Sequence, residues 1–571
     1  GITNDNDDDG ILNPGESVSL TFQAYILSAP SNAENVTVSL NSELDWVHFY
    51  PSEIYIGTLP VNGNSVNIQT QLILDDVDAL QTANFNLHID AEFFDDGTII
   101  DYSDVFEYGL EVTLNQSGFP ITTSEIRSSP LIIDIDNDGN KEIVFGDYIG
   151  VIHIYNLDGT EHMDNGFPFM TENQIWGSPA AADIDGDGYL DFVIPSKNKH
   201  LYVFDHSGIK LDYETDLYLI GTPAIGNFDD DEELEIVFSG YSSGNKVFVI
   251  NHDGTNVEGF PLNLGEKTKA GTALGDFNGN GKDDIVLGTD DDNLYLIYDD
   301  GSIAPGFPFV AGDKFQAAPS IADLNGEKII FAGNNDHKLY AINSDGSMRF
   351  SLLTGDDVNT SPAFAEINGD LHVLFGSKDD HIYISDMDGN MLSNWPILVN
   401  GNIEGSIICS NLDDYNGIEV VTVTDLGNII AFHLDGTPYQ HFPIINDSPF
   451  SGAPIIENID DDDDLEIISG SLNSLIIIDI KEWSNANNHW NMFRGNKKRT
   501  GYFSFSNESE CSVDLGDVNG DAIINILDLV QISYYILEYS IPSHECAADF
   551  NNDNQIDILD LVQIVNYILS E

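Results

Sequence analysis

The chain has 571 residues, enough for about two to four domains, and 42% of them are hydrophobic, so the chain can bury cores and is not disordered as a whole. Asp and Glu number 97 against 19 Lys and Arg, which gives a formal net charge of −78. A field of this sign repels nucleic acid and anionic lipid, and we exclude both as partners. No run of about 18 apolar residues occurs, so we expect no insertion into a membrane.

Residues 1–117 alternate apolar and polar side chains in short runs, as in 17–22 and 35–40, with Gly, Pro and Asn turns between the runs. Alternation of period two without helical runs predicts a β-sandwich of about a hundred residues. The chain opens at Gly1 with neither an initiator Met nor a signal peptide. This opening indicates a processed product, or the C-terminal part of a longer one.

An acidic loop opens this region. Calcium is a hard cation that takes about six to eight oxygen ligands, and a twelve-residue loop supplies them from alternating positions, one of them a backbone carbonyl. The predicted ligands are Asp5, Asp7, Asp9, the Ile11 carbonyl, Asn13 and Glu16, with Gly10 at the sharp turn. The Asn-Pro-Gly-Glu ending of the loop resembles accessory β-sandwich modules that follow catalytic domains in secreted bacterial enzymes.

Residues 118–503 contain an internal repeat. A step of a small residue, usually followed by Pro, recurs at intervals of roughly 43–50 residues, the length of a four-stranded propeller blade. The steps are Ser129-Pro130, Ser178-Pro179, Thr222-Pro223, Thr272-Ala273, Ala318-Pro319, Ser361-Pro362, Ser406-Ile407 and Ala453-Pro454. The repeat predicts an eight-bladed β-propeller, with seven blades and an irregular segment as the alternative. We expect the strand around 118–120 to complete the last blade, which would seal the sheet edges.

Acidic loops follow the first strand of most units, with the spacing Asp-x-Asp/Asn-x-Asp/Asn-Gly-x-x-Asp/Glu that gathers oxygen ligands. The loops resemble the calcium loops of integrin-α-type propellers with FG-GAP or VCBS-like repeats. The resemblance implies structural ions that stiffen a hairpin. Three loops match with Gly at the turn: Asp134, Asp136, Asp138, Asn140 and Glu142; Asp183, Asp185, Asp187, Tyr189 and Asp191; Asp276, Asn278, Asn280, Lys282 and Asp284. Two match without that Gly: Asn227, Asp229, Asp231 and Glu235; Asn458, Asp460, Asp462 and Glu466.

The remaining units depart from this pattern. Asn411, Asp413 and Glu419 are a partial match, because Tyr415 replaces the central acid. The loops of the fifth and sixth units, near 323–325 and 366–368, are short, and we expect them to have lost the metal.

Residues 504–510 form a short polar linker, and residues 511–571 contain two acidic loops 32 residues apart, each followed by an apolar run of helical period. The predicted ligands are Asp517, Asn519, Asp521, the Ile523 carbonyl, Asn525 and Asp528, then Asp549, Asn551, Asp553, the Gln555 carbonyl, Asp557 and Asp560. Both loops run into the same heptapeptide, at 526–532 and 558–564. This region resembles a dockerin, the paired calcium-loop module that binds cohesin domains. The resemblance implies a small α-helical domain with a cohesin-like partner.

Two departures from dockerins stand out. The turn Gly at position 6 is Ala522 in the first loop and Asn554 in the second. Asn tolerates left-handed backbone geometry better than Ala, so we expect the first calcium site to be the weaker one. Many dockerins carry Ser or Thr where this chain has Ile526-Leu527 and Ile558-Leu559. The apolar pairs indicate either a different partner surface or core residues.

Three cysteines occur. Cys511 and Cys546 each precede one C-terminal loop, and we predict a disulfide between them in an oxidising compartment, with two thiols as the alternative. Cys409 lies in an apolar strand pattern and is predicted to be buried as a small hydrophobe.

The loops together predict roughly seven to nine calcium ions. About nine ions at two charges each would leave a charge of about −60, so most of the acidity belongs to the hydrated surface. We predict no catalytic residues, since no nucleophile or zinc motif occurs and the His residues are scattered. A chance carboxylate pair for glycoside hydrolysis stays open.

The sequence favours three alternative functions. The first is a secreted or cell-surface calcium-binding scaffold that docks through 511–571, with a polysaccharide or cell-surface ligand on the propeller. The second is a self-assembling surface-layer or filament subunit, in which 511–571 binds a neighbouring subunit. The third is a carbohydrate-active enzyme, or the non-catalytic tail of a larger secreted hydrolase.

Overall fold

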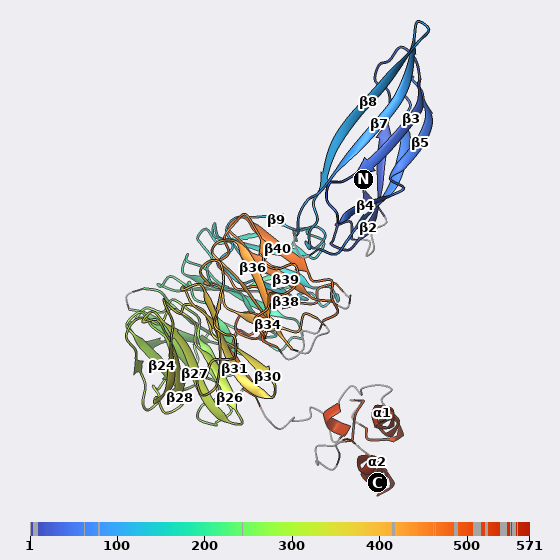
Figure 1. The fold of residues 1–571 in the computed structure, drawn as a ribbon. Helices are drawn as coiled ribbons and strands as arrows, with labels where there is room; N and C mark the ends of the chain where they lie inside the picture. The colour runs from blue at the N-terminus through green and yellow to red at the C-terminus, as the bar shows by residue number, and fades with distance from the viewer. Residues whose placement is uncertain are drawn as a thin grey trace. The chain divides into compact units, whose positions relative to one another are not determined.

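The computed structural model describes residues 2–3, 9–61, 63–77, 80–242, 244–413, 417–460, 462, 464–484, 489–505, 516–519, 523–536, 545–548, 550, 556 and 558–570. It divides into two compact units, one of Gly1–Ala322 with Lys328–Phe503 and one of Asp323–Glu327 with Ser504–Glu571. The first unit holds the sandwich and the repeat, and the second holds the helices (Figure 1).

The N-terminal region is the predicted β-sandwich of two four-stranded antiparallel sheets. One sheet has the order β1 (Ile2–Thr3), β2 (Ser17–Ala24), β6 (Val66–Leu74), β4 (Val47–Tyr50), and the other β5 (Glu53–Leu59), β3 (Ala33–Asn41), β7 (Ala83–Asp95), β8 (Thr98–Leu110). Alternate residues face inward, so that Val18 and Leu20 of β2 pack in one core with Val38 and Leu40 of β3. The period-two pattern therefore located both strands and their buried faces correctly.

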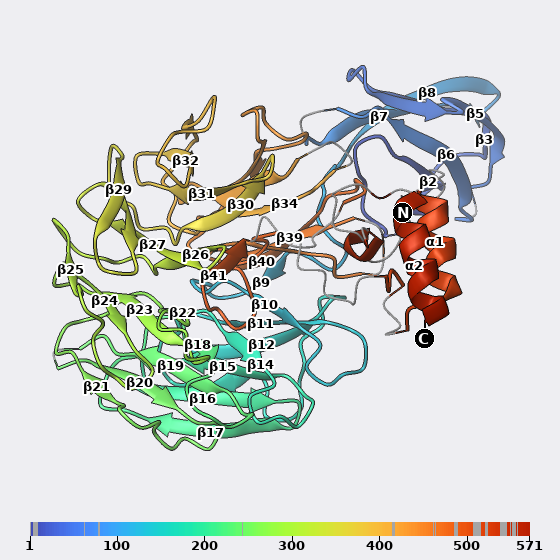
Figure 2. The same cartoon turned by 90° about the horizontal axis from the view of Figure 1, so that it is seen from below.

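The repeat forms eight antiparallel sheets, and successive sheets are the blades of the propeller (Figure 2). Blades one to four are β10 (Leu131–Ile133), β11 (Glu142–Gly146), β12 (Val151–Asn156), β13 (Phe169–Met170); β14 (Ala180–Ala182), β15 (Asp191–Pro195), β16 (His200–Asp205), β17 (Gly208–Glu214); β18 (Ala224–Gly226), β19 (Glu235–Ser239), β20 (Lys246–Ile250), β21 (Leu262–Asn263); β22 (Ala273–Gly275), β23 (Asp284–Gly288), β24 (Asn293–Ile297), β25 (Phe309–Val310).

Blades five to eight continue the same order. They are β26 (Ser320–Leu324), β27 (Glu327–Asn334), β28 (Lys338–Asn343), β29 (Met348–Leu353), with β41 (Tyr502–Phe505) next to β26; β30 (Ala363–Ile367), β31 (Asp370–Gly376), β32 (His381–Asp386), β33 (Ile397–Leu398); β34 (Ile408–Ser410), β35 (Glu419–Val423), β36 (Asn428–His433), β37 (Ile444–Ile445); β38 (Ile455–Glu457), β39 (Glu466–Gly470), β40 (Ser474–Asp479), β9 (Ile121–Thr122).

The ring closes through the N-terminal strand of the repeat. β9 pairs antiparallel with β40, with Ile121 opposite Leu475 and Thr122 opposite Ser474. Phe145 of the first blade shares a buried apolar cluster with Ile477 of the last. An early strand thus completes the last blade, as expected, and the blade count is eight rather than seven.

An axial segment, residues 489–503, lies against the first strands of the blades. The backbone N–H groups of Ala181, Ile225 and Leu274 donate to carbonyls of this segment at 2.8–3.0 Å, and that of Ile456 donates to the Asn491 carbonyl at 2.8 Å. These bonds satisfy inner strand edges that a ring of blades would otherwise leave unpaired.

The second unit contains α1 (Ile526–Ile536), the 3₁₀ turn Glu545–Ala548 and α2 (Ile558–Ser570). Val518, Ile532, Ala547, Ala548 and Ile564 form its small core. Each helix follows one predicted calcium loop. Within the described ranges, no helix is long and apolar enough to cross a membrane.

Candidate functional site

Six of the eight blades carry an acidic loop between their first and second strands, and the six loops share one hydrogen bond. The acid that begins the second strand accepts the backbone N–H of the residue seven positions earlier, which closes the loop. The donor–acceptor pairs are Ile135–Glu142 (3.0 Å), Ile184–Asp191 (3.1 Å), Phe228–Glu235 (2.6 Å), Phe277–Asp284 (2.8 Å), Leu412–Glu419 (2.7 Å) and Ile459–Glu466 (2.7 Å). The repeat therefore builds every loop in the same way.

Carboxylate oxygens converge within the loops. In each of three loops, three acids place one oxygen apiece within 4.8 Å of one another: Asp134, Asp136 and Asp138; Asp183, Asp185 and Asp191; Asp229, Asp231 and Glu235. Several buried oxygens lack a hydrogen-bond partner, among them those of Asn227, Asp460 and Glu466. A buried oxygen without a partner costs free energy, and a bound cation would be its partner. The residues of these loops therefore fit calcium.

Burial disfavours the charged form of the closing acids. Burial and neighbouring carboxylates raise the pKa of Glu142 and of Glu235 to about 7, although the hydrogen bond from the backbone N–H lowers each pKa in part. The same causes raise the pKa of Asp284 to about 6 and that of Glu466 to about 10. Negative charge is thus gathered in each loop beyond what the surrounding polar groups compensate.

The loop of the second blade holds a cation that belongs to the chain. The Lys210 ammonium, from β17, lies 2.7 Å from Asp185 and 2.9 Å from Asp191. Although burial opposes its charge, hydrogen bonds to these two acids raise the pKa of Lys210 well above its usual range. The loop that matches the calcium pattern in every ligand position therefore contains an internal counter-charge.

In the seventh blade a side chain that the sequence motif did not include could also hold a metal ion. His433 of β36 converges with Asp413 and Glu419, and its Nδ1 lies 3.0 Å from the Glu419 carboxylate. The fifth and sixth blades replace the loop by two-residue Asn-Gly turns, at 325–326 and 368–369, with positive φ at both residues. Such turns join two strands directly, and they explain the short loops expected there.

The N-terminal loop is described from Asp9 onward, and Asp5 and Asp7 lie outside the described residues. The Glu16 carboxylate accepts the Asn13 N–H at 3.0 Å, and Asp9 accepts the Ile11 N–H at 2.7 Å. Asn13 and Glu16, the last two predicted ligands of this loop, are buried.

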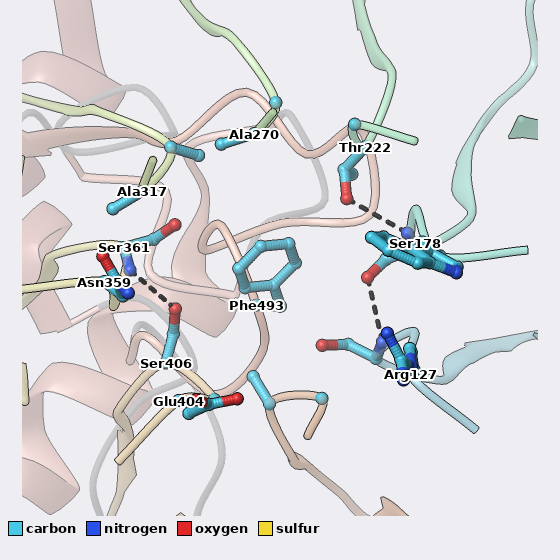
Figure 3. A pocket seen from close by; sticks show the side chains of 18 of the residues that line it. Arg127, Ser178, Thr222, Ala270, Ala317, Asn359, Ser361, Glu404, Ser406 and Phe493 are labelled. Carbon is cyan, nitrogen blue, oxygen red and sulfur yellow. Dashed lines mark hydrogen bonds between the residues drawn. The ribbon is translucent and has the colours of Figure 1, made fainter. Parts of the chain in front are cut away.

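A pocket lies on the propeller axis, on the face where the repeated steps enter the first strands (Figure 3). Its volume is about 140 Å³, and Phe493 of the axial segment lines it. Each blade contributes the residue two positions before the small residue of its step: Arg127, Trp176, Ile220, Lys269, Gln316, Asn359, Glu404 and Ser451. In the fourth blade the step is Gly271-Thr272 rather than the expected Thr272-Ala273, because β22 begins at Ala273 and the other first strands begin directly after the second residue of their step.

The residues around these eight positions are constrained by packing. The Ser178 hydroxyl accepts the Ser129 N–H at 2.9 Å, and the Ser406 hydroxyl accepts the Ser361 N–H at 3.0 Å, so small polar residues link neighbouring blades (Figure 3). A Cβ at Gly221 would lie 2.6 Å from the Ala270 carbonyl oxygen, so only Gly fits there. No two of the eight equivalent lining positions hold the same residue.

The first C-terminal loop is closed by hydrogen bonds to the acid at its last position. Asp528, at the start of α1, is fully buried and accepts the N–H groups of Asn519 at 3.2 Å and Asn525 at 2.8 Å. Asp517 is buried as well, and Asp560 is fully buried at the equivalent position of α2. The predicted residues Asp521, Asp549, Asn551, Asp553, Gln555, Asp557 and Cys511, and the side chain of Cys546, lie outside the described residues.

Comparison with known families matches two parts of the chain. The family described as dockerin type I domain matches residues 515–569. The chain carries a dockerin type I domain at its C-terminus. The family described as FG-GAP-like repeat matches residues 134–194, which span the first two acidic loops. No curated protein matches the chain.

Solved structures that match the chain share little sequence with it. BBS1N in complex with ARL6DN matches in a mercury-soaked crystal (12% identity, TM-score 0.39, 54% of this chain and 93% of that one) and in a lead-soaked crystal (10%, 0.39, 64% and 97%). BamB from Moraxella catarrhalis matches with 14% identity and a TM-score of 0.43, over 65% of this chain and 99% of that one. The blade assignment rests instead on the strand pairing described above.

The dockerin domain exposes apolar side chains on α1. Ile526 is 70% exposed, Leu527 58% and Val530 42%. Ile526 and Leu527 are therefore exposed and are not core residues. Val562, which occupies the position of Val530 in the second heptapeptide, is 52% exposed.

Proposed function

We propose that this chain is a secreted, calcium-binding, non-catalytic scaffold protein that docks to a cohesin-like partner through residues 511–571. The dockerin type I match at 515–569 is the observation that carries this proposal. Together with the FG-GAP-like repeat, it supports an extracellular or cell-surface protein. The proposed division is a sandwich at 1–117, a propeller at 118–503, a linker at 504–510 and the docking domain at 511–571.

Calcium is the proposed cofactor, because dockerin type I domains bind it and the loops supply hard oxygen ligands. The proposed sites are the N-terminal loop, the propeller loops and the two loops of the dockerin domain, for roughly seven to nine ions. In the propeller, an ion would hold the first hairpin of a blade and neutralise its clustered acids. Its role there is structural.

The exposed face of α1, formed by Ile526, Leu527 and Val530, is the proposed contact with the partner. Apolar side chains on a helix face carry binding energy when a partner removes them from water.

We expect Leu527→Glu to abolish binding of the full chain to a cohesin domain in calcium, because the substitution buries a charge. The matched control is Leu426→Glu, since Leu426 is 59% exposed on a propeller turn. Surface plasmon resonance would measure both, and equal binding by the two variants would refute this contact.

The sandwich favours a second candidate function, self-assembly. β8 is an edge strand of 13 residues, and it exposes apolar side chains that include Ile99, Val105 and Phe106. Long apolar edges pair with other strands unless something covers them. Light scattering of the purified chain in calcium distinguishes the two functions, because a monomer favours docking and a growing polymer favours assembly.

A further inference from the structure

Basic residues gather at the axial pocket of a chain that is acidic almost everywhere else. The whole sequence has 97 acidic and 19 basic residues. The pocket and the hollows that adjoin it are lined by Arg127, Lys197, Lys269 and Lys378, and by a single carboxylate, that of Glu404. Among the residues that line these hollows, basic side chains thus outnumber acidic ones, the reverse of the sequence as a whole.

Two of these cations are held by neutral groups. The Lys197 ammonium lies 4.4 Å from the Trp176 ring centroid and donates to the Gln174 amide oxygen at 2.6 Å. The Lys269 ammonium has the Gln316 amide oxygen at 3.4 Å. Within the described part of the chain, neither ammonium has a carboxylate within 4.0 Å, in contrast to Lys210. Aromatic rings and amides hold a cation in place without neutralising it.

The other two cations are paired but remain at the pocket. Arg127 lies over the Trp176 ring at 4.8 Å and donates to Glu125 at 2.6 Å. Lys378 lies 3.2 Å from Glu404. The pocket and its rim thus contain four basic groups and two carboxylates, those of Glu125 and Glu404. A third carboxylate, that of Asp290, lies further out and accepts a hydrogen bond from the Gln316 amide at 2.9 Å.

Two more basic residues lie in the axial segment, which lines the pocket through Phe493. Arg494 and Arg499 of the axial segment are fully buried. Their guanidinium groups donate to backbone carbonyls, those of Pro319 and Thr272 for Arg494 and those of Pro130 and Pro179 for Arg499. No carboxylate among the described residues pairs with either. Because charges interact more strongly away from water, both arginines favour an anion in the pocket that the axial segment lines.

Burial and repulsion between neighbouring cations lower the pKa of two lysines at the pocket. Burial lowers the pKa of Lys269, and the positive charge of Lys378 lowers it further. Burial and the neighbouring Arg127 lower the pKa of Lys197. An anion bound among these groups would relieve that repulsion.

We propose that the axial pocket binds an acidic saccharide, with one sugar carboxylate among Arg127, Lys269 and Lys378. This inference deepens the proposed function by assigning the propeller a ligand class and a site. The Gln316 and Asn359 amides stand beside the cations and suit sugar hydroxyls. Tyr218, which is 46% exposed in the adjoining hollow with Trp176, offers a ring for the apolar face of the next sugar.

The alternatives fit the site less well. A peptide binds most readily by adding a strand to a free sheet edge, and the axial segment already pairs with first-strand edges here. A densely charged polymer such as nucleic acid is repelled by the overall charge of −78. A saccharide with spaced carboxylates places one charge in the pocket and keeps the others apart.

Isothermal titration of the full chain at constant calcium tests this site. The probes are short galacturonate oligomers, a neutral oligosaccharide of the same length, and a Glu-rich peptide. We expect the galacturonate oligomers alone to bind, with an affinity that falls as salt is raised, and Lys269→Met to weaken binding at least tenfold. The matched control is Lys328→Met, which removes the same charge at the start of β27, at the opposite end of the fifth blade from the pocket. We expect it to bind as the unchanged chain does.

Each remaining outcome overturns the assignment. Absence of galacturonate binding at low salt shows that the pocket is not this site. Binding of the Glu-rich peptide with equal affinity shows a peptide site, and equal weakening by both Lys variants shows diffuse, calcium-bridged adhesion. Thermal melting checks that Lys269→Met folds, which we expect since the variant removes a half-buried charge without a carboxylate partner within 4.0 Å among the described residues. Cohesin binding measured on the same samples reports the docking function separately, so failure of one is not failure of the other.

Discussion

At the scale of single residues, Lys210 shows where a sequence motif stops being informative. The second blade loop has the full calcium pattern, yet the ammonium of Lys210 reaches Asp185 and Asp191 from β17, the fourth strand of the blade. His433 reaches the seventh loop from β36 in the same way. Motif spacing records ligands within one loop, and it carries no information on side chains that other strands bring to that loop.

The variant Lys210→Met tests the role of this ammonium. Asp191 is almost fully buried, and removing the partner of a buried charge costs about 3 kcal/mol. We expect the variant to melt at a lower temperature than the unchanged chain in calcium-free buffer, and added calcium to restore much of the loss by filling the vacated position. Differential scanning calorimetry measures both effects. Equal melting temperatures in calcium-free buffer would show that the ammonium does not stabilise the loop.

At the scale of elements, the sequence predicted what repeats and missed what occurs once. Strand patterns, the short Asn-Gly hairpins and the acidic loops recur, and comparison of one unit with the next located them. The axial segment 489–503 has no counterpart in other units, so its pairing with the first strands was not predicted. The pocket was missed for a related reason: the eight equivalent residues that line it, one from each blade, share a position but no residue type.

β9, which closes the ring, is the element whose removal is most informative. Without Ile121 and Thr122, the outer edge of β40 is unpaired, and the first and last blades lose part of their joint core. We expect a chain of residues 118–571 to melt cooperatively, and a chain of residues 124–571 to melt at least several degrees lower and to aggregate through the open edge. Circular dichroism with light scattering makes the comparison. Indistinguishable melting of the two chains would mean that another contact closes the ring.

At the scale of the whole molecule, negative charge and calcium act together. The formal charge of −78 is concentrated partly in loops whose buried carboxylates repel one another. Calcium would remove that repulsion where it is most costly, inside the blade hairpins and at the helix starts of the dockerin domain. We expect a chelator to affect the dockerin domain first, because its core consists of few residues, whereas the propeller keeps its strand pairing and extensive apolar core.

A calcium titration of the calcium-free full chain in the presence of a cohesin domain tests the central claim, which is docking through a calcium-built module. Complex formation is followed by surface plasmon resonance, and folding of the dockerin helices by circular dichroism. We predict that binding and helix formation rise together over one range of calcium concentration, and that excess chelator reverses both. A complex that forms equally well in excess chelator, or a chain with calcium-ordered helices that binds no cohesin domain, would contradict it.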